Sequence, residues 1–186
     1  MTSILITVGS TLFPSLTDKI LSSEIISILI ENGIEKLIIQ YGNANLPFNF
    51  KKEINFKNEE KGKGFIKIEE EKLKIELIRF TNDFENLIKN CDFIISHAGS
   101  GSILTTLRMI PPKPLLIVPN ESLMDNHQSE LAEKMKEQGY SEVSSIDDLQ
   151  VTLPIFLKSR GKKIKSFPQM NRNRFKNILD DLMGFD

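Results

Sequence analysis

Short apolar runs alternate with amphipathic stretches along the chain. Residues 4–8 form an apolar run that ends at Gly9, a pattern typical of a strand buried on both faces of a parallel sheet. Apolar residues then recur at helical spacing over 16–29, and the sequence ENG at 31–33 ends this predicted helix. Residues 36–42 give a second apolar run. The pattern therefore predicts a β-α-β unit with a right-handed crossover.

The same alternation continues to the end of the chain, with Thr81 as the expected N-cap of the next helix. We expect strands at 73–80, 92–96 and 114–119, and helices at 82–90, 101–109, 126–138, 146–158 and 171–183. This spacing predicts a doubly wound α/β fold with a mainly parallel sheet, of the Rossmann-like kind. Ligands of such sheets bind outside the carboxyl ends of the strands, so several strand-end loops are expected to converge there.

A single domain accounts for the whole length. The 186 residues are enough for one sizeable core, and we expect one domain spanning 1–186. Residues 43–72 interrupt the rhythm with a charged, glycine-punctuated stretch. A surface insertion is expected there, as a solvated loop or a short exposed hairpin.

Composition narrows the class of partner. The 24 basic and 25 acidic side chains give a net charge of -1, which does not indicate a nucleic-acid partner. No run approaches the ~18 consecutive apolar residues that span a bilayer, so direct membrane insertion is not expected. Cys91 has no second cysteine to pair with. It is expected to be a core thiol of a protein in a reducing compartment.

The loop after the fourth predicted strand is rich in glycine and serine. Gly99 and Gly101 remove side chains where the backbone must come close to another group. Ser100 and Ser102 add hydroxyl groups at the first turn of a helix, where unpaired amides attract an anion such as a diphosphate. The dinucleotide fingerprint G-x-G-x-x-G is not met, because Leu104 stands where its last glycine belongs. A tight turn that uses glycine only for packing explains the loop equally well.

Polar residues also follow the fifth predicted strand. Asp125 and Asn126 open a helix, where both are ordinary caps. His127 and Gln128 come next and can offer donors and acceptors to sugar hydroxyls, although a solvated helix end accounts for them equally well. His97 lies at a strand end beside the glycines, where a purely structural histidine is less expected.

Two motifs together carry a resemblance to a known family. The segment ISHAGSGSILTTLR is followed by KPLLIVPNESLMDNHQSELAEKMKEQGY. The pair closely resembles the catalytic subunit of the two-part N-acetylglucosaminyltransferase that adds the second sugar to dolichyl-diphosphate N-acetylglucosamine. The opening ILITVGSTLFPSL and the end SFPQMNRNRFKNILDDL resemble the same family. The resemblance therefore covers nearly the whole chain outside 43–72.

The resemblance implies the donor-binding half of a GT-B glycosyltransferase, similar to the bacterial enzyme that makes lipid II. It implies inverting transfer of N-acetylglucosamine from UDP-N-acetylglucosamine to dolichyl-diphosphate N-acetylglucosamine, the second step of lipid-linked oligosaccharide assembly for protein N-glycosylation. The acceptor-binding half is then a separate, membrane-anchored subunit that recruits this cytoplasmic chain to the cytosolic face of the endoplasmic reticulum. No cofactor or metal is implied, and the sequence has no D-x-D pair or His/Cys cluster of metal-ligand spacing.

The matching motif positions imply roles for individual residues. The general base is not assigned by the resemblance; His97 is a candidate from its position at a strand end, although the base could equally belong to the partner chain. The glycine-rich loops would bind the diphosphate, and His127 and Gln128 would contact the sugar hydroxyls. The implied donor-binding residues are Gly9, Ser10, Thr11, Gly99, Ser100, Gly101, Ser102, Thr105, Asn120, Glu121, Asp125, Asn126, His127 and Gln128.

Thr105 departs from the family pattern, because relatives usually carry an acidic residue, suited to the ribose diol, at this position. A threonine hydroxyl can make one hydrogen bond but cannot accept two as a carboxylate does. A non-catalytic nucleotide-sugar-binding or regulatory subunit therefore stays an alternative. A UDP-sugar epimerase of related architecture is a second and weaker alternative, because it needs two such halves in one chain and 186 residues cannot supply them.

Overall fold

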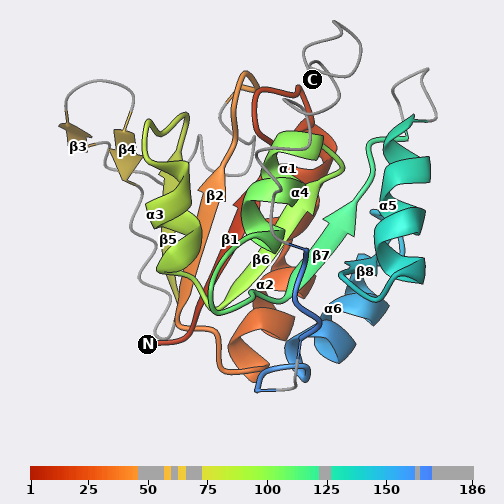
Figure 1. Cartoon of the computed structure of the whole chain (residues 1–186). Helices are drawn as coiled ribbons and strands as arrows, with labels where there is room; N and C mark the ends of the chain where they lie inside the picture. The colour runs from red at the N-terminus through yellow and green to blue at the C-terminus, as the bar shows by residue number, and fades with distance from the viewer. Residues whose placement is uncertain (46–56, 60–62, 66–72, 122–126, 162–163, 169–186) are drawn as a thin grey trace, which may run out of the picture.

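One sheet of six strands forms the centre of the protein (Figure 1). The structure is a computed structural model, and it describes residues 1–45, 57–59, 63–65, 73–121, 127–161 and 164–168. The strands lie in the order β5-β2-β1-β6-β7-β8, and every neighbouring pair is parallel. Their bounds are Ser3–Thr7 (β1), Lys36–Gln40 (β2), Lys74–Ile78 (β5), Phe93–His97 (β6), Leu115–Val118 (β7) and Glu142–Val143 (β8). The prediction of a doubly wound, mainly parallel α/β fold is confirmed.

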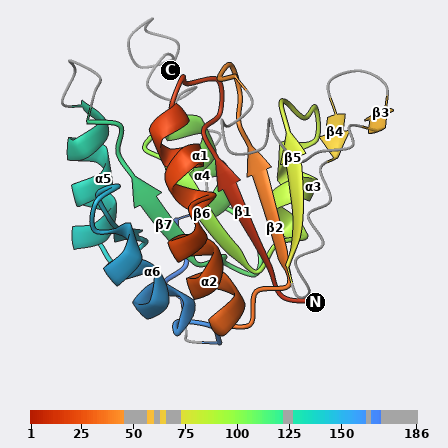
Figure 2. The same ribbon diagram turned by 180° about the vertical axis from the view of Figure 1, so that it is seen from behind.

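Helices cover both faces of this sheet. Figure 1 shows α3 and α4 in front of the strands, and the view from behind in Figure 2 shows α1, α2 and α6 on the other face. The helices are Pro14–Ile20 (α1), Ser23–Glu31 (α2), Phe84–Lys89 (α3), Ser100–Leu107 (α4), His127–Glu137 (α5) and Leu149–Leu157 (α6). Each strand in the middle of the sheet is therefore covered on both sides.

Each face of the sheet has its own hydrophobic core. Along β1, Ile4 and Ile6 pack in one core with Leu16 of α1, and Leu5 packs in the other core with Leu107 of α4. All three β1 side chains are fully buried. Burying one such aliphatic side chain stabilises the fold by roughly 1.5–3 kcal/mol. A strand covered on both faces, such as β1, is therefore apolar at successive positions and does not alternate with polar residues.

The helix predicted over 16–29 is two helices, α1 and α2. Leu21 follows the end of α1, and Ser22 is the N-cap of α2, whose side chain accepts a hydrogen bond from the backbone N–H of Ile25 at 3.4 Å. A serine side chain satisfies an otherwise unpaired amide at a helix start, which makes the break favourable here. The apolar spacing continues across the break, and periodicity alone therefore missed it.

Other predicted boundaries also shift. Asp83 caps α3 by accepting from the N–H of Asn86 at 3.2 Å, so the prediction of Thr81 as the cap is wrong. The aspartate side chain is correctly spaced for the N3 amide. The helix predicted at 101–109 ends at Leu107, and the short strand β8 was not predicted. The helix predicted at 171–183 lies outside the described residues.

Within 43–72, residues 57–59 and 63–65 form an antiparallel pair of short strands. These strands are Lys57–Glu59 (β3) and Lys63–Phe65 (β4), and they make a two-stranded sheet separate from the main one. A short exposed hairpin was one of the two predicted forms; the pairing of β3 with β4 agrees with a hairpin, and its exposure stays a prediction. That the whole stretch is a surface insertion in a single domain stays a prediction.

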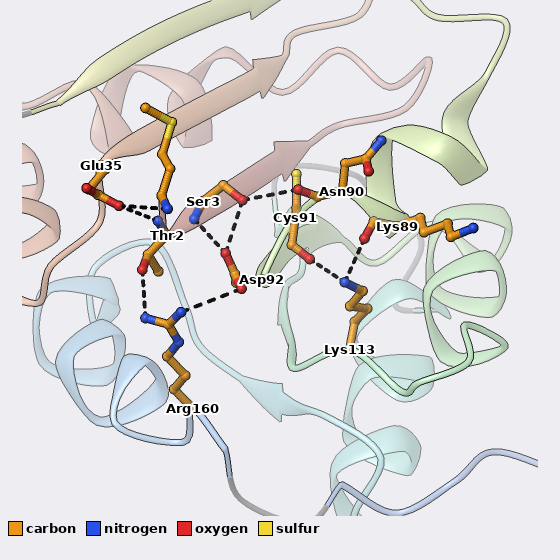
Figure 3. A network of polar contacts seen from close by, with 10 residues as sticks. Thr2, Ser3, Glu35, Lys89, Asn90, Cys91, Asp92, Lys113 and Arg160 are labelled. Atoms are coloured by element: carbon orange, nitrogen blue, oxygen red, sulfur yellow. Dashed lines mark hydrogen bonds and ion pairs between the residues drawn. The ribbon is translucent and has the colours of Figure 1, made fainter.

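Polar contacts hold the amino ends of the central strands together (Figure 3). Asp92, which precedes β6, accepts hydrogen bonds from the Ser3 backbone N–H at 2.8 Å and the Ser3 hydroxyl at 3.2 Å. Arg160, which follows α6, donates to the Thr2 hydroxyl at 2.6 Å and lies 3.8 Å from the Asp92 carboxylate. These contacts attach the segment after α6 to the amino ends of the strands, opposite the carboxyl ends where ligands are expected.

Two expectations from composition can be compared with the structure. Cys91 is 1% exposed, and burial raises the pKa of its thiol to about 11, so the prediction of a core thiol is confirmed. Across the described residues, no helix is both long enough and apolar enough to cross a bilayer.

Candidate functional site

The candidate site lies where the direction of strand order reverses. β1 and β6 are neighbours at the centre of the sheet, and the strands added after each of them extend to opposite sides. The chain leaves β1 toward α1 on one face and leaves β6 toward α4 on the other. In open α/β sheets, ligands bind at this switch point, outside the carboxyl ends of the strands. The loops after β1 and β6 are the two that flank it.

The loop after β1 is a tight turn that begins at Val8. The Thr11 N–H donates to the Val8 carbonyl at 3.0 Å, and Gly9 inside the turn has φ 58°. That backbone conformation favours glycine, since a Cβ atom there is strained. Ser10 is exposed and Thr11 is half-buried. The predicted donor-binding residues of this loop thus lie together at the carboxyl end of β1.

Two of the backbone amides in this turn are already used. The Gly9 N–H donates to the side-chain oxygen of Gln40 at 2.9 Å, and the Thr11 N–H has the bond to Val8 described above. Gly9 therefore shapes the turn and does not offer its own amide to a ligand. Contact between Gly9 and the donor, which the sequence predicted, stays a prediction.

His97, the last residue of β6, fills the space between the two glycine loops. Its side chain is 5% exposed, and Nδ1 lies 3.3 Å from the Thr7 carbonyl oxygen. A Cβ atom added to Gly9 would lie 2.8 Å from the His97 ring carbon Cε1, and one added to Gly99 would overlap Nε2. Both positions must therefore be glycine because the imidazole occupies the room that a side chain would need.

The protonation of His97 follows from its surroundings. A carbonyl oxygen can only accept, so the contact with Thr7 places the ring proton on Nδ1 and leaves Nε2 with a lone pair in the neutral ring. Burial disfavours the charged form and lowers the pKa of His97 below its usual value of 6.5, while the hydrogen bond to Thr7 acts in the opposite direction. The ring is consequently neutral at physiological pH.

The start of α4 is an uncapped helix N-terminus at this switch point. Gly99 is the N-cap and supplies no side-chain hydrogen bond, so the first-turn amides keep their unpaired donors. Ser100 and Gly101 are exposed, and a Cβ atom added at Gly101 would meet nothing within 4 Å. Ser102 Oγ lies 3.7 Å from the position of a Cβ on Gly9, next to the first loop. Donors and a partial positive charge are concentrated here, which suits an anion.

Thr105 lies one turn further along α4. Its hydroxyl donates to the Gly101 carbonyl at 2.8 Å. The proton of this hydroxyl is therefore used within the helix, and its oxygen can offer only an acceptor to a ribose hydroxyl. The neighbouring Thr106 hydroxyl donates to Ser102 in the same way, at 2.8 Å.

The loop after β7 is attached to the loop after β1. Asn120 is 4% exposed, and its side-chain N–H donates to the Leu12 carbonyl at 3.4 Å. Its backbone N–H donates to the Gln128 side-chain oxygen at 3.2 Å, which joins the end of β7 to α5. Glu121, next in the chain, is exposed. Strand-end loops from β1 and β7 thus meet as the sequence predicted.

Three predicted residues are placed only partly or not at all. Asp125 and Asn126 lie outside the described residues, and for His127 only its position as the first residue of α5 is described. The contacts of these three with a sugar therefore stay predictions. Among the part of the chain that the structure describes, no group of three His, Cys, Asp or Glu side chains could hold a metal ion.

Two residues at the site were missed by the sequence reasoning. Gln40 ends β2 and hydrogen-bonds the Gly9 turn, and Gly42, with φ 62°, packs so closely that an added Cβ would lie 2.5 Å from the Gly9 carbonyl oxygen. A polar glutamine at the end of an otherwise apolar strand was the available signal.

Comparison with known proteins gives consistent matches. Residues 3–182 match the model of the glycosyltransferase family 28 C-terminal domain. The chain is 45% identical over 195 residues to the UDP-N-acetylglucosamine transferase subunit ALG13 of Cryptococcus neoformans var. neoformans serotype D, covering 99% of this chain and 98% of that protein. It is similar to the NMR solution structure of ALG13, with a TM-score of 0.63 and 29% identity over 96% of this chain and 94% of that one. The crystal structure of Acinetobacter baumannii MurG has a TM-score of 0.52 and 14% identity, covers 98% of this chain with 49% of its own, and is alike in fold.

Proposed function

The chain belongs to the glycosyltransferase family 28 C-terminal domains, in the branch of the ALG13 transferase subunits, and from this membership we propose that it is the donor-binding, catalytic subunit of a UDP-N-acetylglucosamine transferase. The observation that carries the proposal is the uncapped start of α4, placed at the switch point beside the Gly9 turn. Open α/β sheets bind ligands at this point, and a helix N-terminus there favours a phosphate group.

The proposed reaction transfers N-acetylglucosamine to dolichyl-diphosphate N-acetylglucosamine with inversion. Negative charge builds on the departing UDP while the anomeric carbon becomes cation-like. The first-turn amides of α4 and the hydroxyls of Ser100 and Ser102 are in position to hydrogen-bond the diphosphate as this charge grows. Such pre-aimed donors act on the transition state more than on the ground state, and one well-placed donor is worth ~10²-fold or more in rate.

A general base must take the proton of the acceptor hydroxyl from the face opposite the leaving group. His97 is our candidate, because its neutral ring carries a lone pair on Nε2 at the switch point. Two observations support the alternative, a base on the partner chain: His97 is only 5% exposed, and its ring lies between the two loops proposed to hold the leaving diphosphate.

The acceptor-binding part is proposed to be a separate membrane-anchored subunit. The word subunit in the names of the ALG13 relatives supports a partner, and the chain matches about half of the length of MurG in fold. This partner would bring the chain to the cytosolic face of the endoplasmic reticulum. UDP-N-acetylglucosamine is the proposed donor, and no metal or cofactor is proposed.

The test is a transfer assay with a pair of charge variants. The full chain is added to membranes that contain the acceptor subunit but lack their own donor subunit, with labelled UDP-N-acetylglucosamine. We expect a two-sugar dolichyl-diphosphate product from the wild type. Gly101→Asp places a carboxylate in the first turn of α4 in open space, where it should repel the diphosphate and reduce product at least tenfold.

Ser23→Asp is the matched control, because it places the same carboxylate at the exposed start of α2, away from the site. It should leave product formation unchanged. Absence of product from the wild type, with binding to the acceptor subunit demonstrated, would favour a non-catalytic donor-binding or regulatory subunit. This second candidate function is supported by Thr105, whose hydroxyl already donates its proton within α4.

A further inference from the structure

Gln40 is a buried polar residue with every side-chain bond used at the candidate site. It is 3% exposed and ends β2, one strand away from the loop after β1. Its Oε1 accepts from the Thr7 hydroxyl at 2.7 Å and from the Gly9 N–H at 2.9 Å. Its Nε2 donates to the Gly9 carbonyl at 2.8 Å and to the Arg79 carbonyl at 2.9 Å.

One side chain therefore holds both polar groups of the same glycine. The Gly9 N–H and C=O are bonded to the two ends of a single amide, which fixes the orientation of the whole Gly9 residue. The turn is also packed from two sides, by Gly42 against the Gly9 carbonyl and by the His97 ring against its Cα. A buried amide with four partners is costly to disturb, since any lost bond leaves an unsatisfied group.

We infer that Gln40 is a positioning residue for donor binding, which acts by holding the Gly9 turn against the start of α4. This inference rests on the proposed function, because the ligand in question is the diphosphate of the nucleotide sugar. Gln40 does not touch that ligand, since its oxygen and nitrogen are occupied within the protein. A diphosphate held between two loops requires that the loops keep a fixed separation. If the Gly9 turn were loose, binding would have to order it, and this cost would weaken the affinity for the donor.

The kinetic test uses Gln40→Met, which keeps the length of the side chain and removes all four hydrogen bonds. It is assayed as the full chain with membranes that contain the acceptor subunit. We expect the donor KM to rise about tenfold, the effect of losing roughly one hydrogen bond's worth of binding, while kcat changes less than about threefold. A tenfold loss in kcat with an unchanged donor KM would overturn the inference.

A second variant separates hydrogen bonding from packing. Gln40→Glu keeps an acceptor for Thr7 and Gly9, but its second oxygen faces the carbonyls of Gly9 and Arg79 without a proton to donate. When protonated, it regains one O–H donor. The donor KM of Gln40→Glu, relative to wild type at the same pH, should therefore fall as the assay pH is lowered from about 8 to about 6. The KM of Gln40→Met should show no such recovery, and a parallel recovery would overturn the inference.

Asp92→Asn is the control for loss of stability. Asp92 is also a hydrogen-bonded side chain that links β6 to β1 (Figure 3). It directly precedes β6, at the amino ends of the strands, whereas the site lies at their carboxyl ends. This variant should lower the melting temperature and leave the donor KM unchanged. A rise in donor KM equal to that of Gln40→Met would show that general destabilisation causes the effect, and would overturn the inference.

Amide hydrogen exchange of the isolated chain tests the same inference without any ligand. The Gly9 N–H has only side-chain acceptors, Gln40 at 2.9 Å and Thr7 at 3.3 Å, whereas the adjacent Val8 N–H donates to the Gln40 backbone carbonyl at 3.2 Å. In Gln40→Met, exchange of Gly9 should accelerate at least tenfold relative to Val8. An unchanged ratio would overturn the role of Gln40 even if the chain binds donor. A changed ratio in a chain that never binds donor would instead contradict the proposed function.

Discussion

His97 combines two properties that pull its role in different directions. Its ring fills the gap between Gly9 and Gly99, which is a packing role, and its neutral Nε2 is in the protonation state that a general base needs. Mutation to alanine removes both properties together. A variant that keeps some volume and the hydrogen bond to Thr7 is therefore needed to separate them.

For catalysis, we predict that His97→Ala lowers kcat far more than it weakens donor binding. Loss of a general base typically costs 10²–10⁴-fold in rate, roughly, whereas the diphosphate contacts on α4 remain. His97→Gln, which restores a donor toward the Thr7 carbonyl, should recover donor KM and melting temperature but not kcat. The measurement is steady-state transfer with membranes containing the acceptor subunit. If kcat and donor affinity fall by equal factors in both variants, His97 is not the base.

For pH dependence, we predict that acidification below about pH 6.5 destabilises the fold through His97. Burial lowers the pKa of the folded-state ring below its usual 6.5, so the unfolded chain binds this proton first as pH falls. The stability linked to His97 is thus complete above pH 6.5 and is lost as pH falls toward the lowered pKa. Glu35 affects stability only at lower pH, because a hydrogen bond from the Thr2 backbone lowers the pKa of its carboxyl group below 4.5.

The measurement is the melting temperature of wild type and His97→Gln between about pH 5 and pH 7.5. The wild type should lose stability over this range more steeply than the variant, since glutamine has no proton to bind. Identical slopes in the two proteins would contradict the prediction.

Sequence patterns located His97, Gly9 and Gly99 but not Gln40. A histidine and two glycines directly after a buried strand stand out within a few residues of each other. Gln40, by contrast, reaches Gly9 because β2 pairs with β1 in a register that places it opposite Thr7. That register depends on packing between segments more than 30 residues apart. The local pattern marks Gln40 only as a polar residue at the end of an apolar strand, so its contact with Gly9 became recognisable only in the structure.

Among the elements, the break between α1 and α2 depends on one capping side chain. Ser22 accepts from the Ile25 N–H at 3.4 Å, and its hydroxyl donates to the Lys19 carbonyl at 2.7 Å, so it serves the end of one helix and the start of the next. We predict that Ser22→Ala lowers the free energy of unfolding by about 1 kcal/mol. Ser23→Ala, at the adjacent exposed position, should change it by less than about 0.5 kcal/mol. Urea unfolding of both variants checks this, and equal effects would contradict the cap.

The central strands could be predicted element by element, whereas the shortest strand could not. β1, β2, β6 and β7 are buried on both faces, so each appears in the sequence as an uninterrupted apolar run. β8 is only Glu142–Val143 at the edge of the sheet, and its pairing with β7 comes from tertiary contact. The helix break at Ser22 was missed for a related reason, because both helices present apolar residues to the same core.

At the scale of the whole molecule, the two ends of the strands differ in what they do. At the amino ends, contacts among Ser3, Asp92 and Arg160 attach the segment after α6 to the sheet. At the carboxyl ends lie the Gly9 turn, the start of α4 and Asn120, whose contacts join separate loops. Substitutions that change stability can therefore be separated from substitutions that change ligand binding. The comparison of Asp92→Asn with Gln40→Met relies on this separation.

Membrane association should depend on a protein partner and not on lipid charge. With 24 basic and 25 acidic side chains, the net charge of -1 gives no overall attraction to an anionic bilayer. We predict that the full chain does not co-float with vesicles containing anionic phospholipid, but co-sediments with membranes that contain the acceptor subunit. Binding to the protein-free vesicles, or equal binding to membranes without the acceptor subunit, would show that lipid itself recruits the chain and would remove the need for a recruiting partner.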